Sequence, residues 1–135
     1  MSMGLFGKLL AGVLALSVVL FAGCKAAPIY EVVSAPIPAP AGKALTLDDV
    51  QKAIARGASR SGWQAQPEGP GRMSARFQSG RHLASVNIDH DTKAYSIKMR
   101  DTNVRNDGTS VHPAYNNWVQ SLDRAIRVEL SSIGQ

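Results

Sequence analysis

The chain has 135 residues, with 15 lysines and arginines against 10 aspartates and glutamates, which gives a formal net charge of +5 when histidines are neutral. This length is sufficient for one small domain with a single hydrophobic core. A single cysteine is present, which excludes an intramolecular disulfide, a zinc site with several cysteines and a c-type haem attachment motif.

The first 24 residues have the layout of an export signal. Lys8 precedes an apolar stretch at 9–22, and small residues precede the cysteine in Phe21-Ala22-Gly23-Cys24. A charged start, a short apolar run and a small-residue cleavage site are typical of a secretory signal peptide. The run is short for a membrane-spanning helix, which needs about 20 apolar residues. A transmembrane anchor with an apolar Cys24 is the alternative interpretation.

The segment Phe21-Ala22-Gly23-Cys24 resembles the lipobox of bacterial lipoproteins. This resemblance implies that residues 1–23 are cleaved off as a signal peptide. It also implies that the thiol and the new amino group of Cys24 carry acyl chains such as palmitate, which leaves no thiol for catalysis. Aspartate after the cysteine is the inner-membrane retention sign in enteric-type sorting, whereas this chain has Lys25. The resemblance therefore implies a lipid anchor in the outer membrane, facing the periplasm.

Residues 24–44, which begin with the lipidated cysteine, are predicted to form a Pro/Ala-rich tether. In a polyproline II conformation this tether would reach about 60 Å. Its exception is the apolar segment Ile29–Val33, which either adds an edge strand or docks on a partner. The folded domain is then expected over 45–135. The prolines that break a helix or a central strand here are Pro28, Pro36, Pro38 and Pro40.

A first helix is predicted to begin at Thr46, whose hydroxyl can cap it while Asp49 supplies a carboxylate in a capping-box arrangement. Gly57 weakens this helix, and Ser61-Gly62 ends it. Residues at helical spacing are expected to face the core, namely Leu47, Val50, Ile54 and Ala58. A basic stripe at steps of four is interpreted as solvated surface and comprises Lys52, Arg56 and Arg60.

Apolar and polar residues then alternate, which predicts strands at 73–78, 84–88 and 95–100 and a shorter one near Trp63. Turns are predicted at 67–71, 79–80 and 90–93. The alternation gives the sheet one apolar and one polar face. The polar face is a candidate binding surface that contains Arg76, Asn87, Lys98 and Arg100.

A polar loop at 101–111, with a turn at Asn106-Asp107-Gly108, leads to a second helix that begins at Pro113. His112 is expected to cap this helix or to bond to the loop. Tyr115 and Trp118 lie in its apolar stripe and are expected chiefly as core anchors. The predicted fold class is therefore α+β: an antiparallel meander of three to four strands with two helices packed on one face, in the order α-β-β-β-β-α.

The C-terminal third resembles a recurring pattern in small uncharacterised lipoproteins of Gram-negative bacteria. The residues that carry the resemblance are Tyr95, Asp101, His112, Tyr115, Asn116, Trp118 and Leu122. It implies a periplasmic domain without catalytic residues that can be carried over. The strand and helix order is also similar to small domains of outer-membrane barrel-assembly lipoproteins, which is a likeness of fold alone.

The sequence contains no strong catalytic or metal-binding motif. His82, His90 and His112 lack the paired spacing of a metal site. The 101–112 loop fails as a calcium loop because Arg105 and His112 stand where oxygen ligands belong. No GxSxG elbow, glycine-rich phosphate loop or pair of glycosidase carboxylates is present. No cofactor is therefore expected, and the chain is not expected to be an enzyme.

The leading hypothesis is a lipid-anchored, non-enzymatic binding module of the cell envelope. Its partners would be the membrane and an envelope protein or anionic polymer, while export argues against nucleic acid, and the positive charge is interpreted chiefly as an aid to solubility. The candidate contacts are Arg76, Lys98, Arg100, Asp101 and Asn103.

Two other hypotheses stay open. The first is a small-ligand carrier or an enzyme with its site at the 101–118 loop–helix junction, around Asp101, His112, Tyr115 and Asn116. This site requires a cavity beside His112. The second is a purely structural role as a spacer in the envelope.

Overall fold

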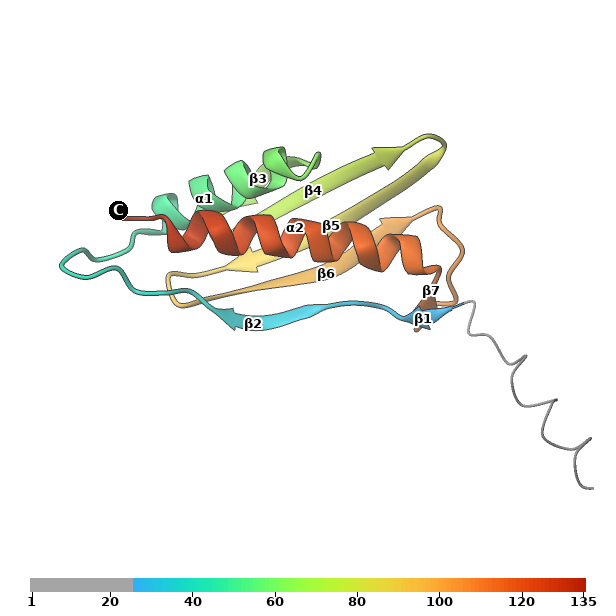
Figure 1. Ribbon diagram of the computed structural model, residues 1–135, viewed down its shortest axis with the longest axis horizontal. Helices are drawn as coiled ribbons and strands as arrows, with labels where there is room; N and C mark the ends of the chain where they lie inside the picture. Colours follow the sequence, from blue (N-terminus) through green and yellow to red (C-terminus); the bar gives the residue numbers. More distant parts are fainter. Residues whose placement is uncertain (1–25) are drawn as a thin grey trace, which may run out of the picture.

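The computed structural model describes residues 26–135. The predictions for Lys8, for the signal peptide at 1–23 and for Cys24 lie outside the described residues. The elements of the described part, shown in Figure 1, are β1 (Ala27–Pro28), β2 (Val32–Pro36), α1 (Leu47–Arg60), β3 (Gln64–Gly69), β4 (Arg72–Ser79), β5 (His82–His90), β6 (Ala94–Thr102), β7 (Ser110–Val111) and α2 (Pro113–Ser131).

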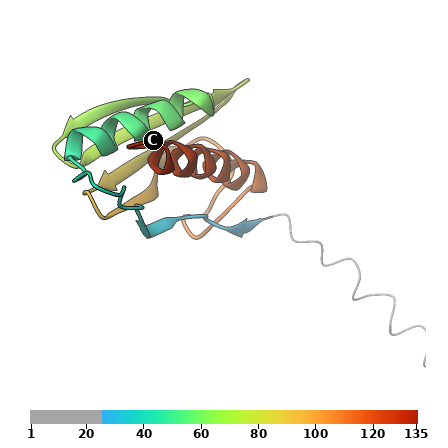
Figure 2. The same cartoon turned by 60° about the vertical axis from the view of Figure 1, so that its left-hand side comes forward.

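Five of these strands form one antiparallel sheet in the order β2-β6-β5-β4-β3, and β1 pairs with β7 in a separate ribbon. Both helices lie on the same side of the five-stranded sheet (Figures 1 and 2). The predicted α+β class, with an antiparallel sheet and two helices packed against it, is confirmed. The sheet is wider than predicted because β2 joins its edge beside β6.

Helix α1 begins where its capping residues predict. The Thr46 hydroxyl accepts a hydrogen bond from the Asp49 amide at 3.1 Å, and the Asp49 carboxylate accepts one from the Thr46 amide at 3.1 Å. These two bonds satisfy amide donors that an uncapped helix leaves free. At the other end, the Ser61 amide donates to the carbonyls of Gly57 and Ala58.

Gly57 is required where the two helices cross. A Cβ atom at this position would lie 2.7 Å from the Cα of Ile126 in α2. Real Cβ contacts are not that short, so any side chain would push the helices apart. The residue that lowers the intrinsic stability of α1 therefore permits its close packing on α2.

The segment expected to begin the tether is folded onto the domain over residues 27–37. Val32, Ala35 and Ile37 are buried there, which selects the edge-strand alternative for this region and corrects the expected domain start at 45. Ser34 has φ of +49° at a bulge between Val32 and Ala35. Because the bulge adds one residue to β2, the side chains of Val32 and Ala35 both point into the core. Pro36 ends the strand at the sheet edge, where a missing amide donor is tolerated.

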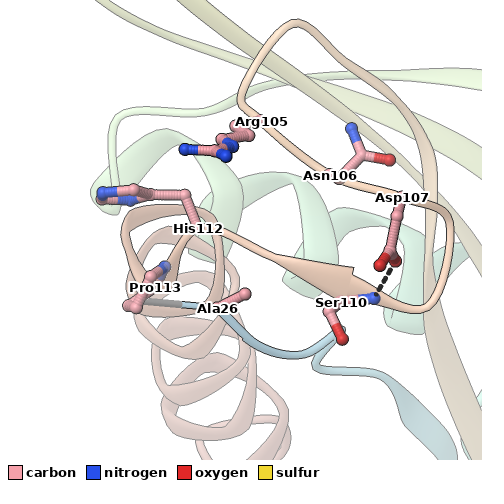
Figure 3. Close-up of a pocket in the computed structure, with 7 residues that line it drawn as sticks. All are labelled: Ala26, Arg105, Asn106, Asp107, Ser110, His112 and Pro113. Atoms are coloured by element: carbon pink, nitrogen blue, oxygen red, sulfur yellow. Dashed lines mark hydrogen bonds between the residues drawn. The ribbon is translucent and has the colours of Figure 1, made fainter. Parts of the chain in front are cut away.

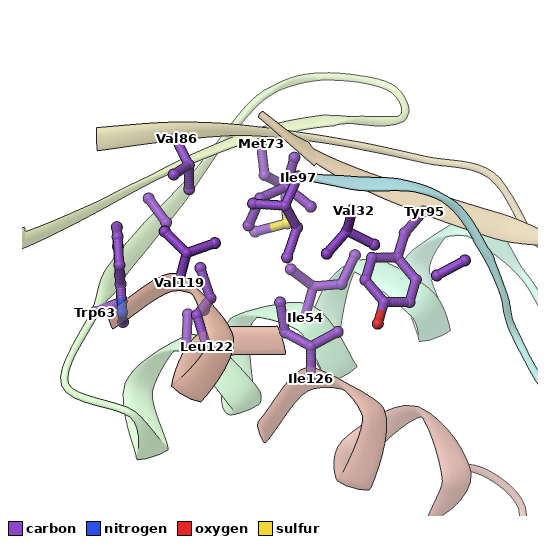
Figure 4. Packing of buried hydrophobic residues seen from close by; sticks show 14 of the residues in the cluster. Val32, Ile54, Trp63, Met73, Val86, Tyr95, Ile97, Val119, Leu122 and Ile126 are labelled. Atoms are coloured by element: carbon purple, nitrogen blue, oxygen red, sulfur yellow. The ribbon is translucent and has the colours of Figure 1, made fainter. Parts of the chain in front are cut away.

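The core lies between the sheet and the helices (Figure 4). Strands β4 to β6 contribute Met73, Val86 and Ile97, while Ile54 and Leu122 come from the helices, and each of these is at most 1% exposed. Side chains at alternate positions of the same strands point to the other side of the sheet. No helix of the described residues 26–135 covers that side.

Candidate functional site

The side of the sheet opposite the helices, here called the open face, consists of rows of polar side chains. One row runs through Gln66, Ser74, Asn87 and Lys98, which stand directly opposite one another on β3, β4, β5 and β6. A second row contains Gln64, Arg76 and Ser85, and a third contains Arg72, Asp89 and Ser96. The predicted polar face is therefore present.

A depression of about 500 Å³ lies on the open face. It brings together four predicted contact residues, because Arg76, Arg100, Asp101 and Asn103 all line it. A bulge in β6 contributes to this arrangement, since Arg100 is an extra residue between the pairs Val86–Met99 and Ser85–Asp101. Lys98 lies on the same face outside the depression. The other lining residues are Gln66, Glu68, Ser74, Leu83, Ala84, Ser85 and Thr102.

The charges of the open face are partly paired. Arg100 forms an ion pair with Glu68 at 2.6 Å, and Arg72 lies 3.5 Å from Asp89. The hydrogen bond from Arg100, followed by one from Ser74, lowers the pKa of Glu68. Ser74 is only 4% exposed. Among the described residues, Arg76 and Lys98 have no ion-pair partner, so these two cations are available to a ligand.

Asn103 lines the depression but is committed to the backbone. Its side-chain oxygen accepts a hydrogen bond from the Leu83 amide at 2.7 Å, and its side-chain nitrogen donates to the Arg81 carbonyl at 2.8 Å. The side chain thus fixes the β4–β5 hairpin against the end of β6. Its role is to shape the rim of the depression.

A second hollow, of about 700 Å³, lies at the loop–helix junction (Figure 3). Arg105 and His112 line it together with Ala26, and the other lining residues are Asn106, Asp107, Ser110 and Pro113. The His112 Nδ1 atom accepts a hydrogen bond from the Ala114 amide at 3.1 Å, so the predicted capping of the second helix is confirmed. Because Nδ1 is the acceptor, a neutral ring carries its proton on Nε2.

The predicted turn at 106–108 forms one wall of this hollow. The Asp107 carboxylate accepts hydrogen bonds from the amides of Ser110 at 2.7 Å and Thr109 at 2.9 Å. These bonds, that from Ser110 first, lower the pKa of Asp107. The charge of Asp107 is therefore used to hold the loop.

Tyr115 and Asn116 do not belong to a ligand site as the junction hypothesis required. Tyr115 is fully buried, and burial raises the pKa of its hydroxyl. Asn116 accepts a hydrogen bond from the Tyr30 amide at 2.9 Å and donates one to the Pro28 carbonyl at 2.8 Å. Tyr115 is thus part of the core, and Asn116 holds the 28–30 segment against α2. Asp101 lines the depression on the open face, so the structure separates it from His112.

A buried carboxylate network was not predicted from the sequence. Asp123 is 4% exposed and accepts hydrogen bonds from Tyr95 at 2.5 Å, Tyr30 at 3.2 Å and Arg127 at 3.0 Å. Burial, followed by the bond to Asp123, raises the pKa of Tyr95. One feature of the sequence does indicate that Asp123 is buried. It lies four residues after Val119 and directly after Leu122, within the apolar stripe of the second helix. The network joins β6, α2 and the segment before β2.

The basic stripe of α1 also has a structural role. Glu129 of α2 is 7% exposed and pairs with Arg56 at 3.0 Å and Arg60 at 3.1 Å. Lys52 pairs with Asp48 of its own helix at 2.9 Å. Two members of the stripe therefore join α1 to α2 by sharing the Glu129 carboxylate, which offsets one of their two positive charges.

Within residues 26–135, no group of three or more histidine, aspartate or glutamate side chains is placed to hold a metal ion. No helix in the same range is long and apolar enough to cross a membrane. His90 is buried, and both its ring nitrogens lack a hydrogen-bond partner in the described structure.

No family model, no curated protein and no solved structure matches the chain. The geometry offers two surfaces of different character. One is the depression on the open face, and the other is the hollow beside Ala26.

Proposed function

We propose that the chain is a lipid-anchored binding protein of the bacterial envelope, attached through Cys24 and facing the periplasm from the outer membrane. The domain has a recognition role and no catalytic role, and the open face is its recognition surface. The lipobox-like segment at 21–24 supports the anchor. The one-sided arrangement of the helices supports the recognition role.

The observation that carries the proposal is the depression on the open face, which Arg76 lines, with Lys98 on the same face outside it. A sheet face that binds nothing needs only polar side chains in contact with water. Here two cations without an ion-pair partner in the described structure flank a concave surface of amide, hydroxyl and charged groups. Such a surface matches a ligand that supplies carboxylates opposite Arg76 and Lys98.

The charge pattern favours a protein partner over an anionic polymer. Arg72 and Arg100 are neutralised by Asp89 and Glu68, and Asp101 adds a further negative charge beside the depression. A polyanion is attracted by an uninterrupted basic surface. Alternating charges and amides instead allow register-specific contacts with a folded protein.

The carrier or enzyme hypothesis has one supporting observation, the hollow beside His112. Its other proposed residues are not there, since Asp101 lines the depression and Tyr115 is buried. A lone imidazole beside an arginine lacks the second group needed to orient a reacting proton. The position of the hollow next to Ala26 favours a role near the anchor instead.

The test is site-specific photocrosslinking in cells that produce the full chain. A photoreactive residue at Asn87, in the middle of the open face, is expected to capture one defined protein. The same residue at Arg124, which is exposed on α2, serves as the matched control. Mass spectrometry of the N-terminal peptide reports acylation of Cys24 in the same preparation.

Charge reversal then identifies the contact. Arg76→Glu is expected to reduce the Asn87 crosslink at least fivefold, whereas Arg124→Glu leaves it unchanged. Equal crosslinking from Asn87 and Arg124 contradicts the open face as recognition surface. A crosslink to an envelope polymer in place of a protein overturns the choice of partner.

A further inference from the structure

The folded domain begins much closer to Cys24 than a tether allows. Ala27 already pairs with Val111 in the β1–β7 ribbon, so the chain from Cys24 to the first paired position is three residue-to-residue steps long. A chain extends at most about 3.5 Å per residue, which limits this connection to about 10 Å. If Cys24 carries the lipid, as the proposed function requires, the domain lies directly against the membrane.

The topology identifies which end of the domain is near Cys24. β1 lies beside β7 and the beginning of α2 (Figure 1), Ala26 lines the hollow with His112, and the Ile29 amide donates to the Thr109 carbonyl at 3.1 Å. The β4–β5 hairpin is joined to this region through Asn103, which bonds to Arg81 and Leu83. We call residues 26–28, 79–83 and 103–113 together the anchor end.

The far end of the domain contains the opposite ends of the same strands. The 38–46 loop and the C-terminus are there, and Pro38 and Gln135 line one shallow depression. Acidic residues occupy this end: Asp48 and Asp49 begin α1, and Asp89 and Asp91 flank the β5–β6 turn. Lys43, Lys52 and Arg72 pair with Asp49, Asp48 and Asp89, so charge does not draw the far end to a negative membrane surface.

The anchor end presents hydrogen-bond donors toward the same side as Ala26. Arg105 is exposed and lines the hollow with His112 (Figure 3). Since His112 Nδ1 accepts a bond from Ala114, the ring's other nitrogen is a donor. The Asp107 carboxylate is occupied by the amides of Ser110 and Thr109. A guanidinium and an imidazole donor together suit a phosphate oxygen.

We propose that the anchor end lies on the lipid surface and that the hollow between Arg105 and His112 receives the phosphate of a lipid headgroup. This inference rests on the lipid anchor of the proposed function. In this orientation β4, β5 and β6 run away from the membrane. The open face then stands upright and is accessible to a partner from the side.

The test uses the full acylated chain, purified from membranes and reconstituted in vesicles of phosphatidylcholine and phosphatidylglycerol. The acylated Cys24 has no free thiol, so a single introduced cysteine can be labelled with a fluorophore. Asn117→Cys places the probe in the first turns of α2 at the anchor end, and Ala41→Cys places it at the far end. A headgroup-bound nitroxide lipid is expected to quench the Asn117 probe several-fold more than the Ala41 probe.

A charge reversal tests the hollow itself. Arg105→Glu is expected to reduce quenching of the Asn117 probe at least twofold, whereas Arg124→Glu leaves it unchanged. Unchanged quenching in the Arg105→Glu variant overturns the phosphate contact. Equal quenching of both probes in an acylated chain overturns the orientation alone. A chain without an acyl group on Cys24 overturns both this inference and the lipid anchor.

Discussion

The two faces of the sheet are built from the same strands but differ in what their polar groups do. On the covered face, Met73 and Val86 are almost fully buried, and the buried carboxylates Asp123 and Glu129 of helix α2 above it are held by hydrogen bonds and ion pairs. On the open face, Arg76 in the depression and Lys98 outside it have no ion-pair partner in the described structure. Residues of the covered face therefore hold the domain together, whereas Arg76 and Lys98 of the open face can contact a ligand.

The difference predicts opposite outcomes for substitutions at neighbouring positions. A change on the covered side alters packing, so it should lower stability whatever the ligand. A change on the open face removes a contact that only a ligand completes. Paired measurements of stability and binding therefore test the separation directly.

The largest effect is expected at the helix crossing over the covered face. Gly57→Val places side-chain atoms where a Cβ would already lie 2.7 Å from the Ile126 Cα, so the free energy of unfolding should fall by about 3 kcal/mol. Denaturant unfolding measures it. The matched control is Ser59→Val, at an exposed position of the same helix. Equal losses in both variants contradict the role of the close approach.

The Asp123 network should give the next largest effect. Asp123→Ala leaves the buried Tyr95 hydroxyl without its acceptor, so the free energy of unfolding should fall by about 2–3 kcal/mol. Tyr95→Phe in the same chain removes the orphaned hydroxyl and should recover part of the loss. Strict additivity of the two single changes in denaturant unfolding contradicts a shared network.

A smaller, pH-dependent effect is expected from His90, which lies at the end of the covered face. Burial lowers the pKa of this imidazole, against weaker opposing contributions from the Ile88 backbone, Asp89 and Asp91. The unfolded chain therefore binds a proton at a higher pH, near 6.5, than the folded chain does. Stability from this group is complete above that pH and falls as the pH decreases through it.

The measurement for His90 is the denaturant midpoint at pH 7.5 and pH 5.5, a range in which carboxylates change little. His90→Met cannot be protonated, so its midpoint should change less between the two pH values than that of the unmodified chain. Identical pH dependence in both chains would show that His90 does not carry the effect.

The smallest effect on stability is expected on the open face. Arg76→Glu should change the free energy of unfolding by no more than about 0.5 kcal/mol, because Arg76 is exposed and without an ion-pair partner in the described structure. The same change is expected to abolish most of the Asn87 crosslink. A large loss of stability would show that Arg76 helps to hold the domain together, and would contradict the proposed difference between the two faces.

The sequence predicted the helices and the four-stranded meander because their signals are local. The capping pair Thr46 and Asp49 and the alternation through 73–99 depend on residues within a few positions of each other. Local sequence does not decide between an edge strand and a docking segment for β2, because its partner, β6, is about 60 residues away. Its prolines also match the composition of a tether.

The candidate site residues also differ in whether local sequence or long-range contacts determine their positions. Alternation was sufficient to place Arg76, Lys98 and Arg100 on one polar face. It could not show that Asn103 and Asn116 bond to distant backbone groups, because those partners come together only in the folded chain. The buried position of Asp123 depends on Tyr30 and Tyr95, which approach it from other elements.

The contacts of the segment beside Cys24 also determine when it can fold. Tyr30 bonds to Asn116 and Asp123, which follow it by 86 and 93 residues. If the chain is exported from its N-terminus, as the proposed function requires, these partners cross last, and pairing between distant segments is slow. On that route, residues 27–37 have no folded partners until α2 has crossed. For a lipoprotein this interval leaves Cys24 open to the acylating and cleaving enzymes before the domain closes against the membrane.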